Sequence, residues 1–179
     1  MQHKSETIRF ILRPFRLEDV DDFFEMESDP EVHKFIGKTP VKTKEEVQKL
    51  IQGVFDQYEK NGIGRWAIED KNTGEVVGWS GIKLEDQALD FEYYDVGYRI
   101  KRKHWGKGIA TEVGLESVRY GFVEMKLDKI AGGAEVEHDV SNHLLQKIGL
   151  KPAGIVKAFG KDHYWFEISR EDWLKENEH

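Results

Sequence analysis

Residues 101–112 read KRKHWGKGIATE, and this stretch is the most informative part of the chain. Four lysine or arginine side chains fall within its first seven residues, although the whole chain carries a formal net charge of −7. Gly106 and Gly108 follow at the expected start of a helix, and glycine permits positive φ and a close ligand approach. The first N–H groups of a helix are unpaired and carry the positive end of its dipole, so they attract phosphate. The stretch therefore predicts a phosphate site at a strand-to-helix turn.

Two widespread nucleotide motifs are not met here. The dinucleotide fingerprint G-x-G-x-x-G fails because Thr111 stands where the third glycine belongs, and the G-x-x-x-x-G-K-[ST] loop does not occur. A plain turn with a solvated basic edge is one alternative interpretation, and an unrelated nucleotide-phosphate binder is another. The stretch is therefore compatible with phosphate binding, although it matches neither of these common motifs.

Outward from this turn, hydrophobic periodicity predicts a mixture of strands and helices. Residues 44–59 carry apolar side chains at helical spacing, behind a capping box formed by Thr43 and Glu46. The Asn and Gly in residues 71–74 suit a tight hairpin turn. The expected strands are residues 8–13, 65–70, 75–84, 91–100, 129–135, 152–158 and 163–168, and the expected helices are residues 17–26, 44–59, 108–125 and 139–148. This order predicts an α/β domain with a mixed sheet, in one unit spanning residues 1–179.

Composition excludes several classes of protein. The 179 residues are 39% hydrophobic, enough for a folded core, and contain no cysteine, so disulfides and thiolate metal sites are excluded. The seven histidines show no metal-binding spacing, and we expect no metal. An excess of acidic residues disfavours nucleic acid as the main ligand. No apolar run approaches the roughly 20 residues of a membrane span, and no signal core follows Met1, so we expect a cytoplasmic protein without membrane contact.

Four segments together resemble the GNAT superfamily of N-acetyltransferases. The turn is similar to its R/Q-x-x-G-x-G/A segment, and residues 105–112 resemble the W-G-K-G-x-A-T-E signature of the ribosomal-protein-alanine acetyltransferase branch (RimJ/RimL type). Residues 95–100, DVGYRI, look like the strand before that segment. Residues 12–19, LRPFRLED, resemble the family's L-R-P-x-x-x-x-D start, and residues 141–149 resemble its S-x-x-x-x-x-K-x-G helix end. The resemblance spans nearly the whole chain.

The resemblance implies the GNAT acyl-CoA N-acyltransferase fold, with a central, mostly antiparallel sheet flanked by helices. It also implies an enzyme that uses acetyl-CoA as co-substrate and moves the acetyl group directly to a primary amine. The acceptor is left open among a protein N-terminus, a polyamine, an amino sugar and a small metabolite amine. A catalytically silent CoA-binding sensor of the same fold is the alternative function, and a homodimer is one of the open oligomeric states.

The resemblance also implies which residues bind the co-substrate. They are Val96, Tyr98, Ile100, Lys103, His104, Trp105, Gly106, Lys107, Gly108, Ala110, Thr111, His138, Asn142 and Lys147. Three positions depart from the family pattern. Lys103 replaces an Arg or Gln, His138 replaces an Asn, and Leu145 stands where other branches carry a proton-donating Tyr.

Direct acetyl transfer needs a group that removes a proton from the amine and a group that assists the leaving thiolate. Asp95 is the first candidate for the base, directly or through water, because it lies two residues before Gly97 on the strand that enters the co-substrate site. Glu92 is the second candidate, and an exposed strand-edge carboxylate is the alternative for both. Ser141 is the candidate for assisting the thiolate, although a residue at a helix start also suits N-capping.

Overall fold

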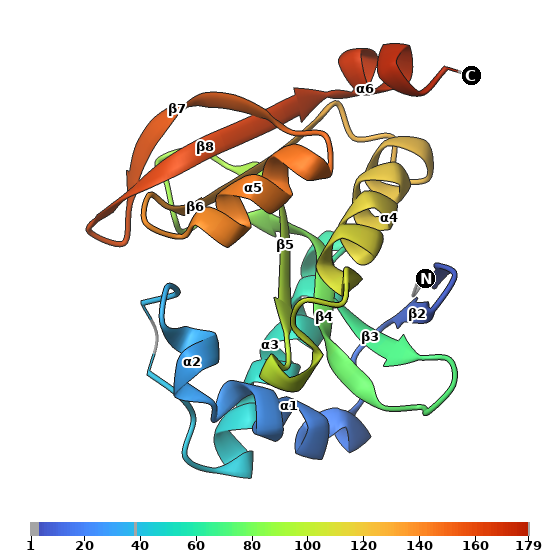
Figure 1. The fold of residues 1–179 in the computed structure, drawn as a ribbon, viewed down its shortest axis with the longest axis vertical. Coiled ribbons are helices and arrows are strands. Elements are labelled where there is room, and N and C mark those ends of the chain that lie inside the picture. Colours follow the sequence, from blue (N-terminus) through green and yellow to red (C-terminus); the bar gives the residue numbers. More distant parts are fainter. Residues whose placement is uncertain (1–3, 38, 179) are drawn as a thin grey trace.

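The computed structural model describes residues 4–37 and 39–178, which form one eight-stranded sheet in the order β1-β2-β3-β4-β5-β6-β8-β7 (Figure 1). The strands are β1 (Ser5–Glu6), β2 (Phe10–Arg13), β3 (Trp66–Asp70), β4 (Val76–Glu85), β5 (Tyr93–Ile100), β6 (Lys129–Glu135), β7 (Lys151–Ala158) and β8 (Lys161–Ser169). All neighbouring strands in the described ranges pair antiparallel except β5 and β6. The expected mostly antiparallel sheet is confirmed.

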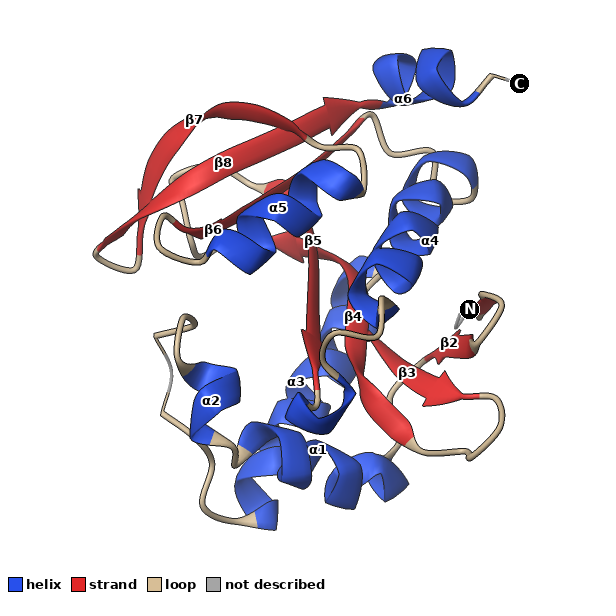
Figure 2. Ribbon diagram, viewed as in Figure 1, coloured by secondary structure: helices blue, strands red, loops and turns tan. Residues whose placement is uncertain are grey.

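Six α-helices and two 3₁₀ helices accompany the sheet in these ranges (Figure 2). They are η1 (Leu17–Asp19), α1 (Val20–Glu27), α2 (Pro30–His33), α3 (Lys44–Asn61), η2 (Arg102–His104), α4 (Ile109–Val123), α5 (Asp139–Lys147) and α6 (Arg170–Asn177). Helices α1 and α3 pack on one face of the sheet, and α4 and α5 pack on the other. None of the described helices has the length and apolar character needed to cross a bilayer.

Helix α3 forms where its sequence signals stand. The Thr43 hydroxyl accepts a hydrogen bond from the backbone N–H of Glu46, and the Glu46 carboxylate accepts one from the N–H of Thr43 at 2.9 Å. This is the predicted capping box. Val47, Ile51 and Val54 are buried along one side of the helix, against α1 and the sheet.

Most of the expected elements agree with the structure to within two residues, and the departures have local causes. Residues 17–26 are not one helix but η1 followed by α1, because Asp19 is buried at the junction. Its carboxylate accepts hydrogen bonds from the Arg13 guanidinium and from the N–H of Arg16. Strand β5 begins at Tyr93 rather than residue 91, so Glu92 lies in the exposed loop before it. The short strand β1 and helix α6 were not anticipated.

The sheet opens between β5 and β6. These two strands are parallel, and a single pair of residues, Asp95 and Ala131, stands in register. The antiparallel neighbour β4 instead pairs with β5 along the whole strand, from Tyr93 to Ile100. In Figure 1, β5 runs down the middle of the view while β6, β7 and β8 turn away from it. The divergence leaves the last part of β5 without a backbone partner on one side, next to the turn at residues 101–108.

Candidate functional site

The turn after β5 presents a helix N-terminus without a side-chain cap. Gly106 and Gly108 both have φ of +74°, and Gly108 is the N-cap residue of α4. No side chain of the described residues caps this helix end. The indole N–H of Trp105 donates to the carbonyl oxygen of Ile100 at 2.8 Å and so ties the turn to the end of β5. The backbone N–H groups at the start of α4 are therefore available to an anion.

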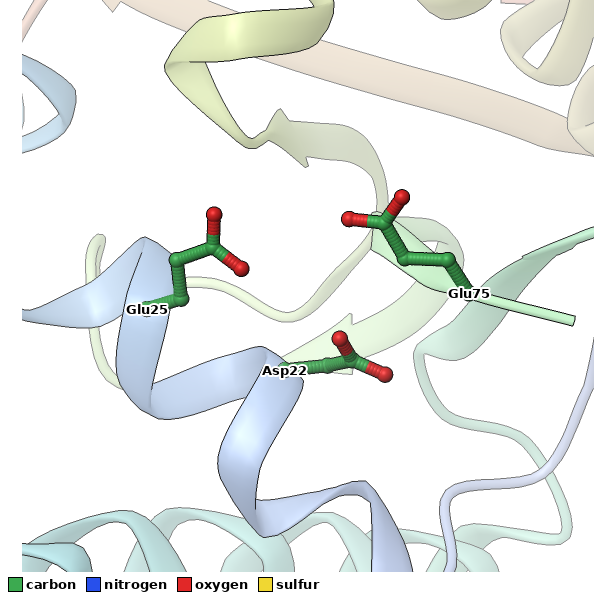
Figure 3. A group of neighbouring side chains, drawn as sticks. All are labelled: Asp22, Glu25 and Glu75. Atoms are coloured by element: carbon green, nitrogen blue, oxygen red, sulfur yellow. The ribbon is translucent and has the colours of Figure 1, made fainter. Parts of the chain in front are cut away.

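Lys101, the first basic residue of the turn, is buried and bound to three carboxylates. Its ammonium lies 2.7 Å from Asp22, 2.8 Å from Glu25 and 2.9 Å from Glu75. Figure 3 shows these carboxylates converging, two from α1 and one from the residue before β4. Their oxygens are close enough together to hold a metal ion, but the Lys101 ammonium supplies the positive charge between them. Lys101 therefore joins α1 to the turn rather than facing a ligand.

The other basic residues of the turn are also largely paired. Lys103 lies 3.0 Å from Glu25 and 2.8 Å from Glu75, and His104 lies 3.2 Å from Glu75. Although partial burial opposes it, hydrogen bonds from Lys103, Lys101 and His104 lower the pKa of Glu75 to about 2. Arg102 approaches Asp29 at 3.4 Å. The structure thus assigns most of this positive charge to internal ion pairs, a point that the sequence alone does not reveal.

Lys107 is the basic side chain of the turn that has no carboxylate partner in the described part of the chain, and it lies beside His104, with 3.4 Å between Nζ and Nδ1. It is exposed, as are Gly106 and Gly108. Behind them, Ala110 and Thr111 are half-buried in the first turn of α4. The Glu112 carboxylate accepts hydrogen bonds from Thr7 and Arg9, which tie the N-terminal segment to α4.

The α5 side of the opening between β5 and β6 carries a row of hydrogen-bonding side chains. The hydroxyl groups of Tyr98 and Ser141 lie 2.8 Å apart, and Ser141 Oγ lies 3.3 Å from His138 Nε2. No side chain of the described residues caps α5, so the capping alternative for Ser141 is not what the structure shows. Burial raises the pKa of Tyr98 and keeps its hydroxyl protonated, and burial also lowers the pKa of His138.

Four further predicted co-substrate residues take different positions around this opening. Val96 and Ile100 are buried in the core beneath α4, so only their backbone faces the opening. The amide nitrogen of Asn142 donates to the carbonyl oxygen of Glu135 at 3.0 Å and fixes α5 to the end of β6. Lys147 is exposed at the last residue of α5.

The ring of Phe35, in the segment after α2, stacks on the imidazole of His138 with a centroid distance of 4.6 Å. This contact brings the α2 side of the molecule against the start of α5. The Phe35–His138 contact therefore connects the segment after α2 to the start of α5.

Asp95 lies on the opposite face of β5 from Val96 and Tyr98, since side chains alternate along a strand. It is ion-paired with Arg65 through its Oδ2 atom. Burial raises the pKa of Asp95, and the charge and hydrogen bond of Arg65 oppose that rise. Glu92, the second candidate base, is exposed in the loop before β5 and is not part of this pair.

Sequence reasoning missed the contact of Arg65 with Asp95, the ion pairs of Lys101 and the hydrogen bond between Tyr98 and Ser141. One signal for Arg65 was present: Gly81 and Gly97 stand inside two neighbouring strands, and glycine in a strand marks a close approach of another group. No comparable signal marked Lys101, because its three partners lie 26 to 79 residues away in the sequence.

Comparisons with known proteins identify the family to which this chain is similar. Residues 9–151 match the family described as an acetyltransferase (GNAT) domain. An N-acetyltransferase of Bacillus licheniformis, named p20 and described as uncharacterized, is 31% identical over 173 residues, covering 93% of this chain and 96% of that protein.

Two solved structures share the fold. A GNAT-family acetyltransferase from Bacillus anthracis has a TM-score of 0.76 at 25% identity, covering 94% of this chain and 99% of that one. RimJ of Mycobacterium smegmatis, solved in complex with CoA-disulfide, has a TM-score of 0.78 at 20% identity and covers 95% of this chain and 88% of that one. At that identity the second likeness speaks for the fold alone.

Proposed function

The chain belongs to the GNAT family of acetyltransferases, enzymes that use acetyl-CoA, and from this premise we propose that it transfers the acetyl group directly to a primary amine. The acceptor amine belongs to a protein N-terminus or to a small molecule. The observation that carries the proposal is the uncapped N-terminus of α4, placed directly beside the opening between β5 and β6. An anion site continuous with a gap in a sheet suits a long co-substrate with a phosphate-bearing end.

The turn at residues 103–108 would bind the pyrophosphate of acetyl-CoA through backbone N–H groups, with Lys107 as the charged side chain. The residues fit this ligand because Gly106 and Gly108 leave the backbone bare on the exposed side. A Cβ on Gly106 would meet open space, and a Cβ on Gly108 would lie 3.7 Å from Arg9 Nη2. Lys103 and His104 would act indirectly, by holding the turn against Glu75.

The free edge of β5 would bind the pantetheine arm. Residues 96–100 offer backbone groups on the side where β6 has turned away. His138 and Asn142 line the start of α5 across the opening, as does Ser141. Lys147 lies further along the same helix, where its charge would serve the phosphate end.

Acetyl transfer forms a C–N bond and breaks the C–S bond of the thioester, and it moves one proton from the amine and one to the thiolate. Asp95 would take the proton from the amine through Oδ1, because Arg65 occupies Oδ2 and no other described group donates to Oδ1. Glu92 stays the second candidate. The exposed loop makes Glu92 a weaker candidate than Asp95, since water screens the charge of an exposed carboxylate.

The thiolate would be assisted by the hydroxyl pair of Tyr98 and Ser141. The pair faces the opening from β5 and α5, and a raised pKa keeps the Tyr98 proton in place until a strong base forms nearby. Leu145, where other branches carry a Tyr, is buried and has no proton to give. Tyr98 would therefore fulfil from β5 a task that is performed from the helix elsewhere in the family.

The nature of the acceptor is tested by measuring thiol release from acetyl-CoA with a panel of amines. The panel contains N-terminal peptides, a polyamine, an amino sugar and simple aliphatic amines. The resemblance of residues 105–112 to the signature of the ribosomal-protein-alanine acetyltransferase branch makes peptides with a free N-terminus the first acceptors to test. Tight binding of acetyl-CoA without thiol release for any amine would point instead to the silent CoA-binding module.

Acetyl-CoA is expected to stabilise the fold. At a concentration about 100 times its dissociation constant it should contribute about 2.7 kcal/mol, because a ligand that binds only the folded state shifts the unfolding equilibrium. For a chain of this size that raises Tm by roughly 5–10 °C. Differential scanning fluorimetry measures the shift, with ATP as the control for a general nucleotide binder. An equal shift with ATP would speak against a CoA site.

Gly108→Val is expected to weaken acetyl-CoA binding by more than tenfold. Gly108 has φ of +74°, which a β-branched residue adopts with strain, and the added side chain would cover the N–H groups at the start of α4. Isothermal titration calorimetry measures the affinity. The matched control is Gly160→Val, since Gly160 has φ of +76° in the turn between β7 and β8, away from α4 (Figure 1). Unchanged affinity in folded Gly108→Val would place the phosphate site elsewhere.

A further inference from the structure

A pair of glycines on two neighbouring strands leaves the face of the sheet beside Asp95 without side chains. Gly81 of β4 and Gly97 of β5 are direct partners across the sheet. The guanidinium of Arg65, which precedes β3, extends over this glycine pair. A Cβ on Gly97 would lie only 2.9 Å from Arg65 Nη2, so a residue other than glycine would push the guanidinium away. The two glycines thus make room for one charged group at one place on this face.

The guanidinium is held there by the strands themselves. Arg65 Nη1 donates to the carbonyl oxygen of Gly81 at 2.5 Å and to that of Asp95 at 2.7 Å. The ring of Trp79 lies against it, with 5.0 Å from Cζ to the ring centroid. The side chain is 9% exposed. A planar group with fixed donors on two strands has little freedom to turn, so it sets the orientation of whatever it binds.

What it binds is one oxygen of the Asp95 carboxylate. Arg65 Nη2 donates to Oδ2, while Oδ1 receives no hydrogen bond from any residue in ranges 4–37 and 39–178. This arrangement leaves one defined oxygen available for a proton. Asp95 is also the residue of β5 that stands in register with Ala131 of β6, at the point where the two strands part.

The charge around Asp95 is set by few groups. Burial raises its pKa, Arg65 and Lys83 lower it, and Glu85 of β4 raises it. Tyr93, two residues earlier on the same face of β5, stays protonated because burial and the charge of Asp95 raise its own pKa. Strand β6 contributes the uncharged Ala131. Arg65 is the group among these that both touches the carboxylate and carries a full opposite charge.

Building on the proposed function, we propose that Arg65 is a positioning residue for acetyl transfer. Its guanidinium, lying over the Gly81–Gly97 pair, orients the Asp95 carboxylate and favours its charged form against the effect of burial, so that Oδ1 is the oxygen offered to the incoming amine. Arg65 does not touch the reacting atoms. The amine proton passes to Oδ1 of Asp95 and from there to solvent, while Arg65 keeps its own protons throughout.

The test is a titration of the Asp95 carboxyl group followed by ¹³C NMR in protein with labelled aspartate, with Asp95→Asn used to assign the signal. In Arg65→Met the pKa of Asp95 should rise by roughly 1–3 units, because a buried carboxylate has lost its opposite charge. Arg65→Lys restores the charge without the planar fork and should return the pKa part of the way. This readout needs no acceptor and no turnover.

Arg13→Met is the matched structural control. Arg13 is also buried and bound to two carboxylates, Asp19 and Glu69, but it belongs to β2. Its loss should lower stability and leave the Asp95 titration in place. If Arg65→Met does not fold, Gly97→Ala tests the same idea, since the added Cβ displaces Nη2 and should also raise the pKa of Asp95.

Activity then separates this proposal from the one on which it rests. With a good acceptor, Arg65→Met should lose kcat at neutral pH and recover it as pH rises, with the KM for acetyl-CoA unchanged. An Asp95 titration that is the same in Arg65→Met and in the parent would overturn the role of Arg65, and so would an equal shift in Arg13→Met. A normal kcat in Asp95→Asn would instead remove the base assigned under the proposed function.

Discussion

Asp95→Asn is expected to lower kcat by about 10²–10⁴-fold, the usual contribution of a general base. The amide keeps the shape of the carboxylate but cannot take the amine proton. Acetyl-CoA affinity should stay nearly unchanged, because Asp95 faces away from the α5 side of β5. The loss should shrink as pH rises, since a larger share of the amine is then already neutral. Parent and variant pH–rate profiles on one acceptor measure both effects.

Glu92→Gln is the control for this substitution. It removes the same charge three residues earlier, from an exposed loop, and should change kcat little. Thermal unfolding of Asp95→Asn is needed beside the kinetics, because Arg65 loses its carboxylate partner in that variant. Equal kcat in the parent and Asp95→Asn, with chemistry rate-limiting, would contradict the assignment. A large loss in Glu92→Gln would transfer the role to that residue.

Lys101→Met is expected to destabilise the fold by about 1–3 kcal/mol, less than the loss of a fully buried ion pair, because its carboxylate partners are partly exposed. The Lys101 side chain is 2% exposed, and its loss brings Asp22, Glu25 and Glu75 together without the buried ammonium between them, although Lys103 still contacts Glu25 and Glu75. The destabilisation should be largest at neutral pH. It should decrease as pH falls, because carboxylates that have lost their counter-charge take up protons more readily. Urea unfolding at several pH values measures it.

Two comparisons sharpen this prediction. Lys103 contacts Glu25 and Glu75 from a half-exposed position, so Lys103→Met should cost at most about 1 kcal/mol. In Lys101→Met the three carboxylates should accept Ca²⁺ in place of the ammonium, since their oxygens lie within 4.8 Å of one another. Added Ca²⁺ should then restore part of the lost stability in that variant alone. A cost below 1 kcal/mol for Lys101→Met would mean that the cluster does not hold α1 to the turn.

The fold was largely predictable because its signals are local. A capping box, hairpin turns and strand-length apolar runs each act over a few residues, and α3, β3, β4 and β6 were placed well for that reason. The junction of η1 and α1 was not, because it depends on a buried contact between Asp19 and Arg13. Sequence patterns report periodicity but not which charged groups will meet.

The candidate site shows the same difference between local signals and contacts made over long distances in the sequence. The positive φ of both glycines in the turn could be predicted, because glycine is the residue type that adopts this backbone conformation readily. The ion pairs of the basic residues could not be predicted, since the carboxylates that pair with Lys101 and Lys103 come from α1 and from Glu75. Net charge over a short stretch says nothing about partners supplied from elsewhere. The assignment of Asp95 as base stays a prediction.

The single register pair between β5 and β6 has a mechanical consequence. Strands β1–β5 form one half of the sheet and β6–β8 the other, and within the described residues Asp95 and Ala131 are the register pair that joins them, with α4 packed across both. Such a joint acts as a hinge, because few backbone hydrogen bonds resist rotation of one half against the other. A ligand lodged in the gap and bonded to β5 would take over the cross-links that β6 does not provide. A bound ligand would then stiffen the sheet, adding to the side-chain core through which Ile82 and Val96 already pack against Ile130 and Phe166.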